Sequence, residues 1–243
     1  MNKLYTIIIA SLLPMISFAQ KKGKVDYVFQ EVANVELDGH LKEWSLYQPT
    51  SAVWSFGISN IQDDLYVAVR IKDPQLQLEA LRSGIFVNIS YSEKKKDGAR
   101  LVFPFVDREK LRALLQDDTR EEGNLKQDML THVRGYYIQG FHKAVDGVLS
   151  LENQYGVKAV VRLDEQEGMI YEAKVPLDLI KFDDKKIAVQ IGVNTSFMQA
   201  QQMNKQVQRM STRSAVYGRG PVVKKASNPY KEETSVWVAG QIK

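Results

Sequence analysis

The sequence predicts a mainly β protein, an antiparallel jelly-roll-like β-sandwich with one or two short helices. Residues 65–71 alternate apolar and polar side chains, which is the period of a strand that buries one face. The same alternation recurs at 85–91, 157–163, 169–175 and 187–193, and turn-forming residues separate several of these segments. The chain has no Cys, so burial of apolar side chains has to stabilise the fold without a disulfide framework.

Residues 1–19 have the pattern of a signal peptide. Asn2-Lys3 gives a short positive start, and residues 4–15 are largely apolar. Ser17 and Ala19 supply small side chains at the two positions that define a cleavage site. A retained membrane anchor is the alternative, but the apolar run is shorter than the ~20 residues that span a bilayer. No Cys follows the cleavage position, so we expect a secreted or periplasmic protein that is not a lipoprotein. Residues 20–243 then form a single domain with no transmembrane span.

The first half of the chain begins with a turn. Asp38-Gly39 predicts this turn because Gly adopts positive φ without strain, and Trp44 is expected to fold back over it into a core. Pro104 cannot donate to a strand ladder, so its strand must lie at an edge or bend there. The segments expected in order are a strand at 64–73, a strand at 85–91, a hairpin turn at 93–98 and a strand at 101–105.

A short amphipathic helix is predicted next, over residues 107–116. Leu111, Leu114 and Leu115 lie at helical spacing, and Asp107 is suited to cap the first turn. The charged residues that follow, 117–128, are expected to form a loop.

The second half is predicted to add three strands and a helical turn. The strands lie at 157–163, 169–175 and 187–193, and Pro176 is placed to begin a single helical turn. Residues 198–231 are basic and rich in Gln, and they lack a clear period, which predicts a long loop. A strand at 236–238 closes the sheet.

Several of these motifs resemble a known family. Asp38-Gly39 followed by Glu43-Trp44, and then a strand from Leu65-Tyr66 to Asp73, is similar to the carbohydrate-binding family 9-like (DOMON-like) domains. Residues 171–177 resemble the penultimate strand of the same family. The resemblance extends from about Val25 to the end of the chain and is clearest in 38–104. It implies a secreted jelly-roll sandwich, and members of the family differ in what they bind.

The sequence argues against catalysis and against nucleic acid as a partner. It contains no Gly-x-Ser-x-Gly elbow, no His-Glu-x-x-His helix and no phosphate-binding loop. The net charge of +4 is too small to indicate nucleic-acid binding. We therefore expect a binding module that is not an enzyme.

A carbohydrate or a similar small polar ligand is the expected partner of this module. Sugars bind to flat aromatic faces flanked by polar side chains. The candidate ligand-binding residues are Trp54, Arg134, Tyr136, Tyr137 and His142. The family's paired stacking tryptophans find no convincing second match in this chain. An alternative function is protein interaction, in which residues 198–231 dock the sandwich onto an acidic partner or an envelope component.

Two further groups are considered as cofactors. The resemblance implies a structural calcium, for which Asp38, Asp63, Asp64 and Asp73 offer hard oxygen ligands. Some sandwiches of this kind hold b-type haem between a Met and a His. The pairs to consider are Met129 with His132, and His142 with Met198.

Overall fold

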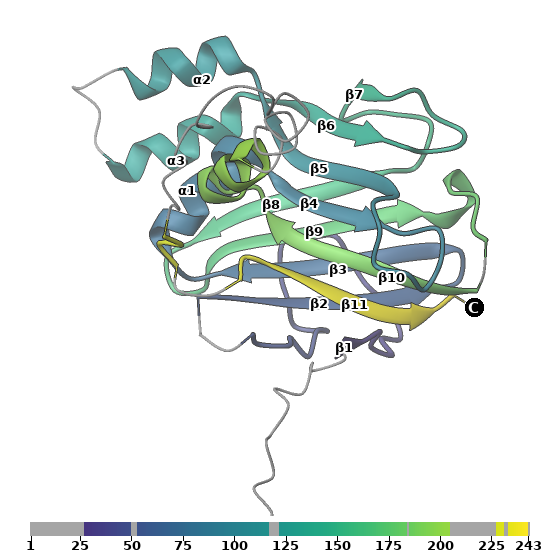
Figure 1. The fold of residues 1–243 in the computed structure, drawn as a ribbon. Coiled ribbons are helices and arrows are strands. Elements are labelled where there is room, and N and C mark those ends of the chain that lie inside the picture. The colour runs from purple at the N-terminus through teal and green to yellow at the C-terminus, as the bar shows by residue number, and fades with distance from the viewer. Residues whose placement is uncertain are drawn as a thin grey trace, which may run out of the picture.

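The computed structural model describes residues 27–49, 53–116, 122–183, 185–204, 227–230 and 233–242. It contains two β-sheets that lie face to face (Figure 1), so the prediction of a mainly β sandwich is confirmed. No helix in the described ranges is long and apolar enough to cross a membrane. The predicted signal peptide, residues 1–19, lies outside the described residues.

The first sheet has seven strands in the order β1-β11-β10-β4-β5-β6-β7. Its neighbouring strands pair antiparallel except β1 and β11, which pair parallel. The strands are β1 (Tyr27–Val28), β4 (Ile85–Ile89), β5 (Ala99–Val106), β6 (Val133–Gln139), β7 (Gly147–Leu149), β10 (Lys186–Val193) and β11 (Ser235–Gln241).

The second sheet has four strands in the order β2-β3-β9-β8, all antiparallel. The strands are β2 (Trp54–Ile61), β3 (Asp64–Ile71), β8 (Lys158–Asp164) and β9 (Gly168–Pro176).

The core lies between the two sheets, and the predicted strand faces form it. Val67, Val87 and Val189 are fully buried in one apolar cluster, and Val161 packs against that cluster. The strand register aligns these core residues across the smaller sheet, because Val67 lies between Ile58 on β2 and Ala173 on β9. All three side chains therefore point to the same face of the smaller sheet.

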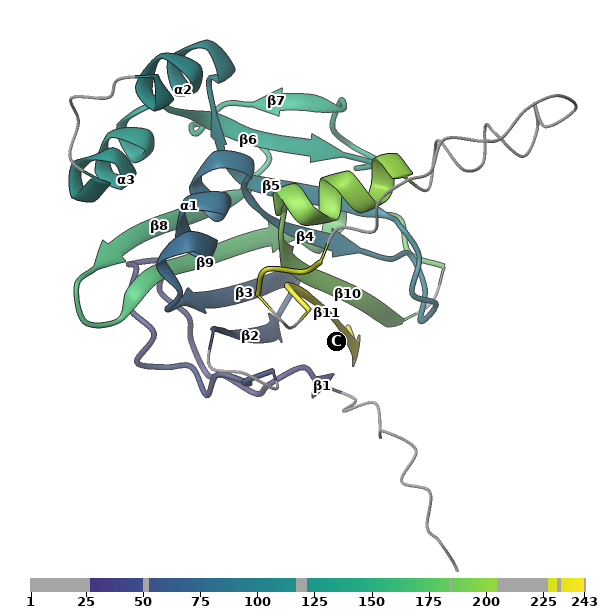
Figure 2. The same ribbon diagram turned by 60° about the vertical axis from the view of Figure 1, so that its left-hand side comes forward.

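Three α-helices gather at one end of the sandwich, with α3 between α1 and α2 (Figures 1 and 2). They are α1 (Pro74–Ser83), α2 (Arg108–Leu115) and α3 (Glu122–Thr131). Helix α2 was predicted, and its Asp107 cap accepts hydrogen bonds from the backbone N–H groups of Glu109 and Lys110. The expected turn after Pro176 is the short 3₁₀-helix η1 (Leu177–Leu179).

Two helical segments lie where the sequence predicts loops. Helix α3 occupies part of the segment predicted as a charged loop, because Met129 is buried in the core and Leu125 packs against it. Residues 196–204 are helical, at the start of the segment predicted as a loop. The rest of that segment lies largely outside the described residues. The fold therefore has more helix than the one or two short helices expected.

Pro104 lies in the interior of the larger sheet. Strand β5 pairs with β4 on one side and with β6 on the other, which excludes an edge position. The pairing with β6 shifts register between Val102 and Phe105, so the chain bends at Pro104, the second of the two expected solutions.

The outer face of the smaller sheet is covered by the chain that precedes β2. We call residues 29–49, which follow β1, the strap. Trp44 is buried there with Val35 and Ala68 in a second, smaller apolar cluster. A methyl group at Gly57 on β2 would come within 2.5 Å of Trp44 Cε3, so only glycine allows the indole to lie this close to the sheet. The expected burial of Trp44 is confirmed.

Candidate functional site

Two hollows lie near the turn between β8 and β9. The large hollow has a volume of about 990 Å³, is open to the surface and is bordered by α1, α3 and this turn. The small hollow, of about 250 Å³, is lined by the strap residues His40, Lys42 and Trp44 and by Arg70 of β3. Glu167, in the turn, lines both hollows. The two hollows therefore meet at one side chain.

Polar side chains of fixed position line the large hollow. Gln77 on α1 donates through Nε2 to the carbonyl of Ile71 at 2.9 Å, and its Oε1 accepts from Lys126 Nζ of α3 at 2.7 Å. Asp73 accepts from the N–H of Leu76 at 2.7 Å and so caps α1. The cap fixes where the helix begins, and the amide of Gln77 then ties the helix to the end of β3 and to α3.

The β8–β9 turn is shaped by one carboxylate. Asp164 Oδ1 accepts from the N–H groups of Gln166 and Glu167, both at 2.9 Å. These two backbone hydrogen bonds, from Glu167 first and then Gln166, hold the pKa of Asp164 below its usual value, and nearby Arg162 adds to the effect. Gly168 ends the turn with φ of +86°, where a side chain would collide with the carbonyl of Ile71.

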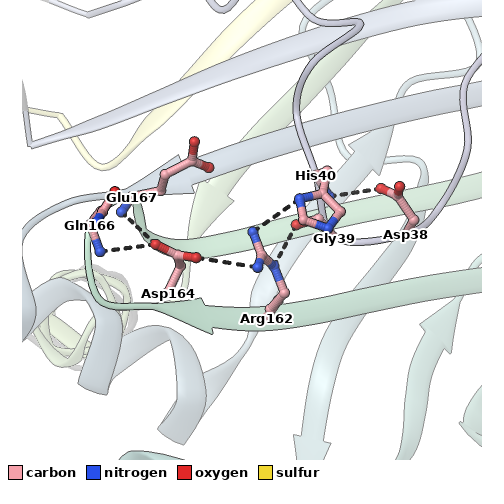
Figure 3. Close-up of polar contacts among 7 residues, drawn as sticks. All are labelled: Asp38, Gly39, His40, Arg162, Asp164, Gln166 and Glu167. Carbon is pink, nitrogen blue, oxygen red and sulfur yellow. Dashed lines mark hydrogen bonds and ion pairs between the residues drawn. The ribbon is translucent and has the colours of Figure 1, made fainter.

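Arg162 joins this turn to the strap (Figure 3). Its Nη1 lies 3.2 Å from Asp164 Oδ2, its Nε donates to the carbonyl of Gly39 at 2.7 Å, and its Nη2 lies 3.3 Å from His40 Nδ1. Asp38 Oδ1 accepts from the N–H of His40 at 2.8 Å. The two loops that border the small hollow are thus held in a fixed relation by one guanidinium.

Glu172 of β9 is buried beneath the strap. It accepts from the N–H of Gly39 at 2.8 Å and from the indole Nε1 of Trp44 at 3.2 Å. Burial raises the pKa of this carboxyl to about 7, because desolvation disfavours the charge more strongly than the two hydrogen bonds favour it. The glutamate therefore anchors the Asp38-Gly39 turn and the tryptophan to the same strand.

Comparison with known proteins finds no matching family model, no matching curated protein and no matching solved structure. The geometry of the chain itself therefore has to support any functional conclusion.

Two of the predicted ligand-binding residues are buried, which corrects their expected role. Trp54 is 1% exposed and donates through Nε1 to the carbonyl of Glu233 at 3.2 Å. Tyr136 is 3% exposed, and its hydroxyl accepts from the N–H of Ala159 at 3.2 Å. Both rings point into the main core, so neither offers a face to a ligand.

The other three predicted ligand-binding residues lie in or after β6, and none of them lines either hollow. Tyr137 is half-buried and its ring stacks on Phe105, with the ring centres 5.8 Å apart. Arg134 is exposed and lies 3.9 Å from Asp107. His142 is exposed in the turn that follows β6.

The four predicted calcium ligands are not brought together. Asp63 and Asp64 lie at the start of β3 and Asp73 follows its other end, so an eight-residue strand separates them by about 25 Å. Asp64 forms an ion pair with Lys174 at 2.7 Å, while Asp73 and Asp38 hold backbone N–H groups as described above. The described residues contain no group of three or more His, Cys, Asp or Glu placed to hold a metal.

The residues considered for haem do not fit it either. Met129 is fully buried in the core, and His132 Nδ1 lies 2.8 Å from the carbonyl of Asp128. Met198 Sδ accepts from the hydroxyl of Thr234 at 3.5 Å, and His142 lies on a different element. Neither pair is among the residues that line the large or the small hollow.

Sequence reasoning did not single out Gln77, Arg70, Arg162 or Glu172. The two arginines and the glutamate occupy polar positions of alternating strands, and alternation identifies such positions only as facing away from the core. Their roles depend on the strap and the β8–β9 turn, which are far away in the sequence.

Proposed function

We propose that the protein is a non-catalytic binding module that takes a carbohydrate or a similar polar ligand in the large hollow. We also propose that it acts in the periplasm or outside the cell. The observation that carries the proposal is the large hollow itself, whose 990 Å³ is at the upper end of the range typical of ligand pockets. Its polar side chains are mounted on a capped helix and on a hydrogen-bonded turn.

The chemistry of the lining suits hydroxyl groups. Gln75, Gln127 and Gln166 supply amides that both donate and accept hydrogen bonds, as sugar hydroxyls require. Leu78 and Leu125 supply apolar surface for the C–H face of a sugar ring. The large hollow thus combines apolar surface with amides, and the described residues that line it include no aromatic ring.

The carboxylates of the large hollow support binding rather than hydrolysis. Glycoside hydrolysis needs one carboxyl with a raised pKa that can donate a proton. Asp164, Glu165 and Glu167 lie together in one turn, and the pKa of Asp164 is lowered by its hydrogen bonds to the backbone. A carboxylate that accepts two backbone hydrogen bonds in this way stabilises the turn and is not suited to donate a proton.

A relationship to the family 9-like domains is part of the same proposal. Its support is the two-sheet fold together with Trp44, which packs over the sheet beside the Asp38-Gly39 turn. The proposed export from the cytoplasm rests on the pattern of residues 1–19.

A glycan array followed by calorimetry tests this proposal. Saccharides that bind should lose affinity in Gln166→Ala and Lys72→Ala, because both side chains line the large hollow and are exposed. The loss expected is about two- to tenfold per variant, the size of one lost hydrogen bond. Gln139→Ala, at the exposed end of β6, is the matched control and should bind as the unaltered protein does. An array without any binder would refute the proposal, as would equal affinities in all three variants.

A further inference from the structure

Arg70 carries an unsatisfied donor at the small hollow. It projects from β3 on the same face as Ala68, which is the face that the strap covers. Its Nε is buried and has no hydrogen-bond acceptor among the described residues. The ion pairs of the described chain include Arg162 and Lys174 but not Arg70. Buried donors are almost always satisfied, so an orphaned guanidinium nitrogen beside a hollow calls for an external acceptor.

Arg162 provides the contrast within the same site. It too projects from the smaller sheet near the strap, yet all three of its nitrogens have partners: Gly39, His40 and Asp164. The strap therefore supplies acceptors to one arginine and leaves the other facing the small hollow without one. The difference separates a structural arginine from one that is available to a ligand.

The charges around the small hollow favour an anion with a single charge. Lys42 and Arg70 contribute two positive charges and Glu167 contributes one negative charge. Together these three side chains leave one positive charge, which one carboxylate neutralises. A phosphate dianion would leave excess negative charge beside Glu167. A guanidinium also matches the two oxygens of a carboxylate in a planar, bidentate arrangement.

We propose that the small hollow binds the carboxylate of an acidic saccharide, held by Arg70 and Lys42, while the neutral part of the sugar lies in the large hollow. Glu167 lines both hollows, so one ligand can extend from one to the other across the β8–β9 turn. This inference rests on the proposed function and narrows its ligand to sugars that carry a carboxylate, such as uronic acids. The volume of 250 Å³ accommodates a carboxylate and the ring atoms next to it.

The test compares D-glucuronate with D-glucose by calorimetry on the full chain. Glucuronate should bind at least tenfold more tightly than glucose, and Arg70→Gln should remove most of this preference while leaving glucose unchanged. Arg70→Lys keeps the positive charge but cannot form the planar, bidentate contact of a guanidinium, so it should retain only part of the preference for glucuronate. Arg108→Gln changes an exposed residue at the start of α2; it is the matched control and should keep the full preference.

A second readout does not depend on a ligand. Because the Nε of Arg70 is unpaired, Arg70→Gln should not lower the melting temperature of the ligand-free protein. Lys42→Ala alters an exposed side chain and should also weaken glucuronate binding, so it keeps the test informative if Arg70→Gln fails to fold.

The outcomes separate the inference from the proposed function. Equal affinity for glucuronate and glucose, or an unchanged preference in Arg70→Gln, would overturn the carboxylate site and leave sugar binding intact. Inorganic phosphate that competes more strongly than glucuronate would also overturn it. Failure of every saccharide, charged or neutral, would refute the proposed function itself.

Discussion

Replacing Glu172 by Gln should abolish a fall in stability that the protein otherwise shows between about pH 4.5 and 7. The pKa of Glu172 is raised from its ordinary value of 4.5 to about 7 by burial beneath the strap. The folded chain therefore retains this proton over a pH range in which the unfolded chain has lost it. Because the folded state then binds more protons, the free energy of unfolding falls as pH rises through this window. Above about pH 7 the contribution is constant.

The magnitude follows from the shift. One pKa unit corresponds to about 1.36 kcal/mol, so a rise from 4.5 to about 7 sets an upper limit of roughly 3.4 kcal/mol. The effective dielectric constant of a protein interior is higher than that of a dry medium and reduces this limit, so we expect an effect of about 1–2 kcal/mol. Glutamine has nearly the same shape and does not titrate, so it keeps the packing of Trp44 and removes the pH dependence. One of its two hydrogen bonds is lost, which lowers stability by a similar amount at every pH.

Urea unfolding followed by tryptophan fluorescence at pH 5, 6, 7 and 8 measures the effect. The difference in slope between Glu172→Gln and the unaltered protein isolates this carboxyl from other titrating groups. Asp164→Asn is the control: the pKa of Asp164 is lowered, so it is ionised throughout this range and its loss should not change the slope. A Glu172→Gln protein whose stability falls with pH as steeply as that of the unaltered protein would refute the reasoning.

Two further substitutions test how the strap and α1 are held. Gly57→Ala places a methyl group 2.5 Å from Trp44 Cε3, and the displaced indole should cost about 1–3 kcal/mol of stability and shift its fluorescence to the red. Unchanged stability and emission would show that the strap moves aside freely. Asp73→Ala removes the cap of α1 and should cost about 1 kcal/mol, equally in calcium and in chelator. A loss that appears only in calcium would instead make Asp73 a metal ligand.

Much of the sandwich could be predicted because the apolar and polar residues of each strand alternate, and the apolar positions identify its buried face. Val67, Val87 and Val189 sit in alternating segments, and alternation alone tells which side of a strand avoids water. The cap at Asp107 is equally local, since it depends on residues within one turn. Trp44 was expected in a core, but the separate cluster on the outer face of the smaller sheet depends on the path of the strap.

The missed helices have local reasons. Helix α3 has Leu125 and Met129 one turn apart, but the charged residues among them favour a loop. Helix α1 has Asp73 as its cap and Pro74 in its first turn, two local signals of a helix start. The composition of α3 thus hides its helical spacing, whereas the start of α1 is visible in its capping residues.

The candidate site could not be predicted because its parts are distant along the chain. The small hollow joins residues 40–46 to Arg70 and Glu167, and the large hollow joins α1 to α3 and the β8–β9 turn. Alternation in β2 placed Trp54 and Phe56 on one face, but it could not tell which face the larger sheet would cover. The larger sheet covers the face that carries Trp54, so the exposed aromatic surface expected there is buried.

The shared position of Glu167 has a thermodynamic consequence. If separate molecules occupy the two hollows, each of them meets the same carboxylate, and a shift in its position or charge is felt on both sides. The resulting cooperativity is reciprocal: the factor by which the first molecule alters the affinity of the second equals the factor by which the second alters that of the first. An oligosaccharide long enough to fill both hollows instead gains or loses this coupling energy within a single binding event.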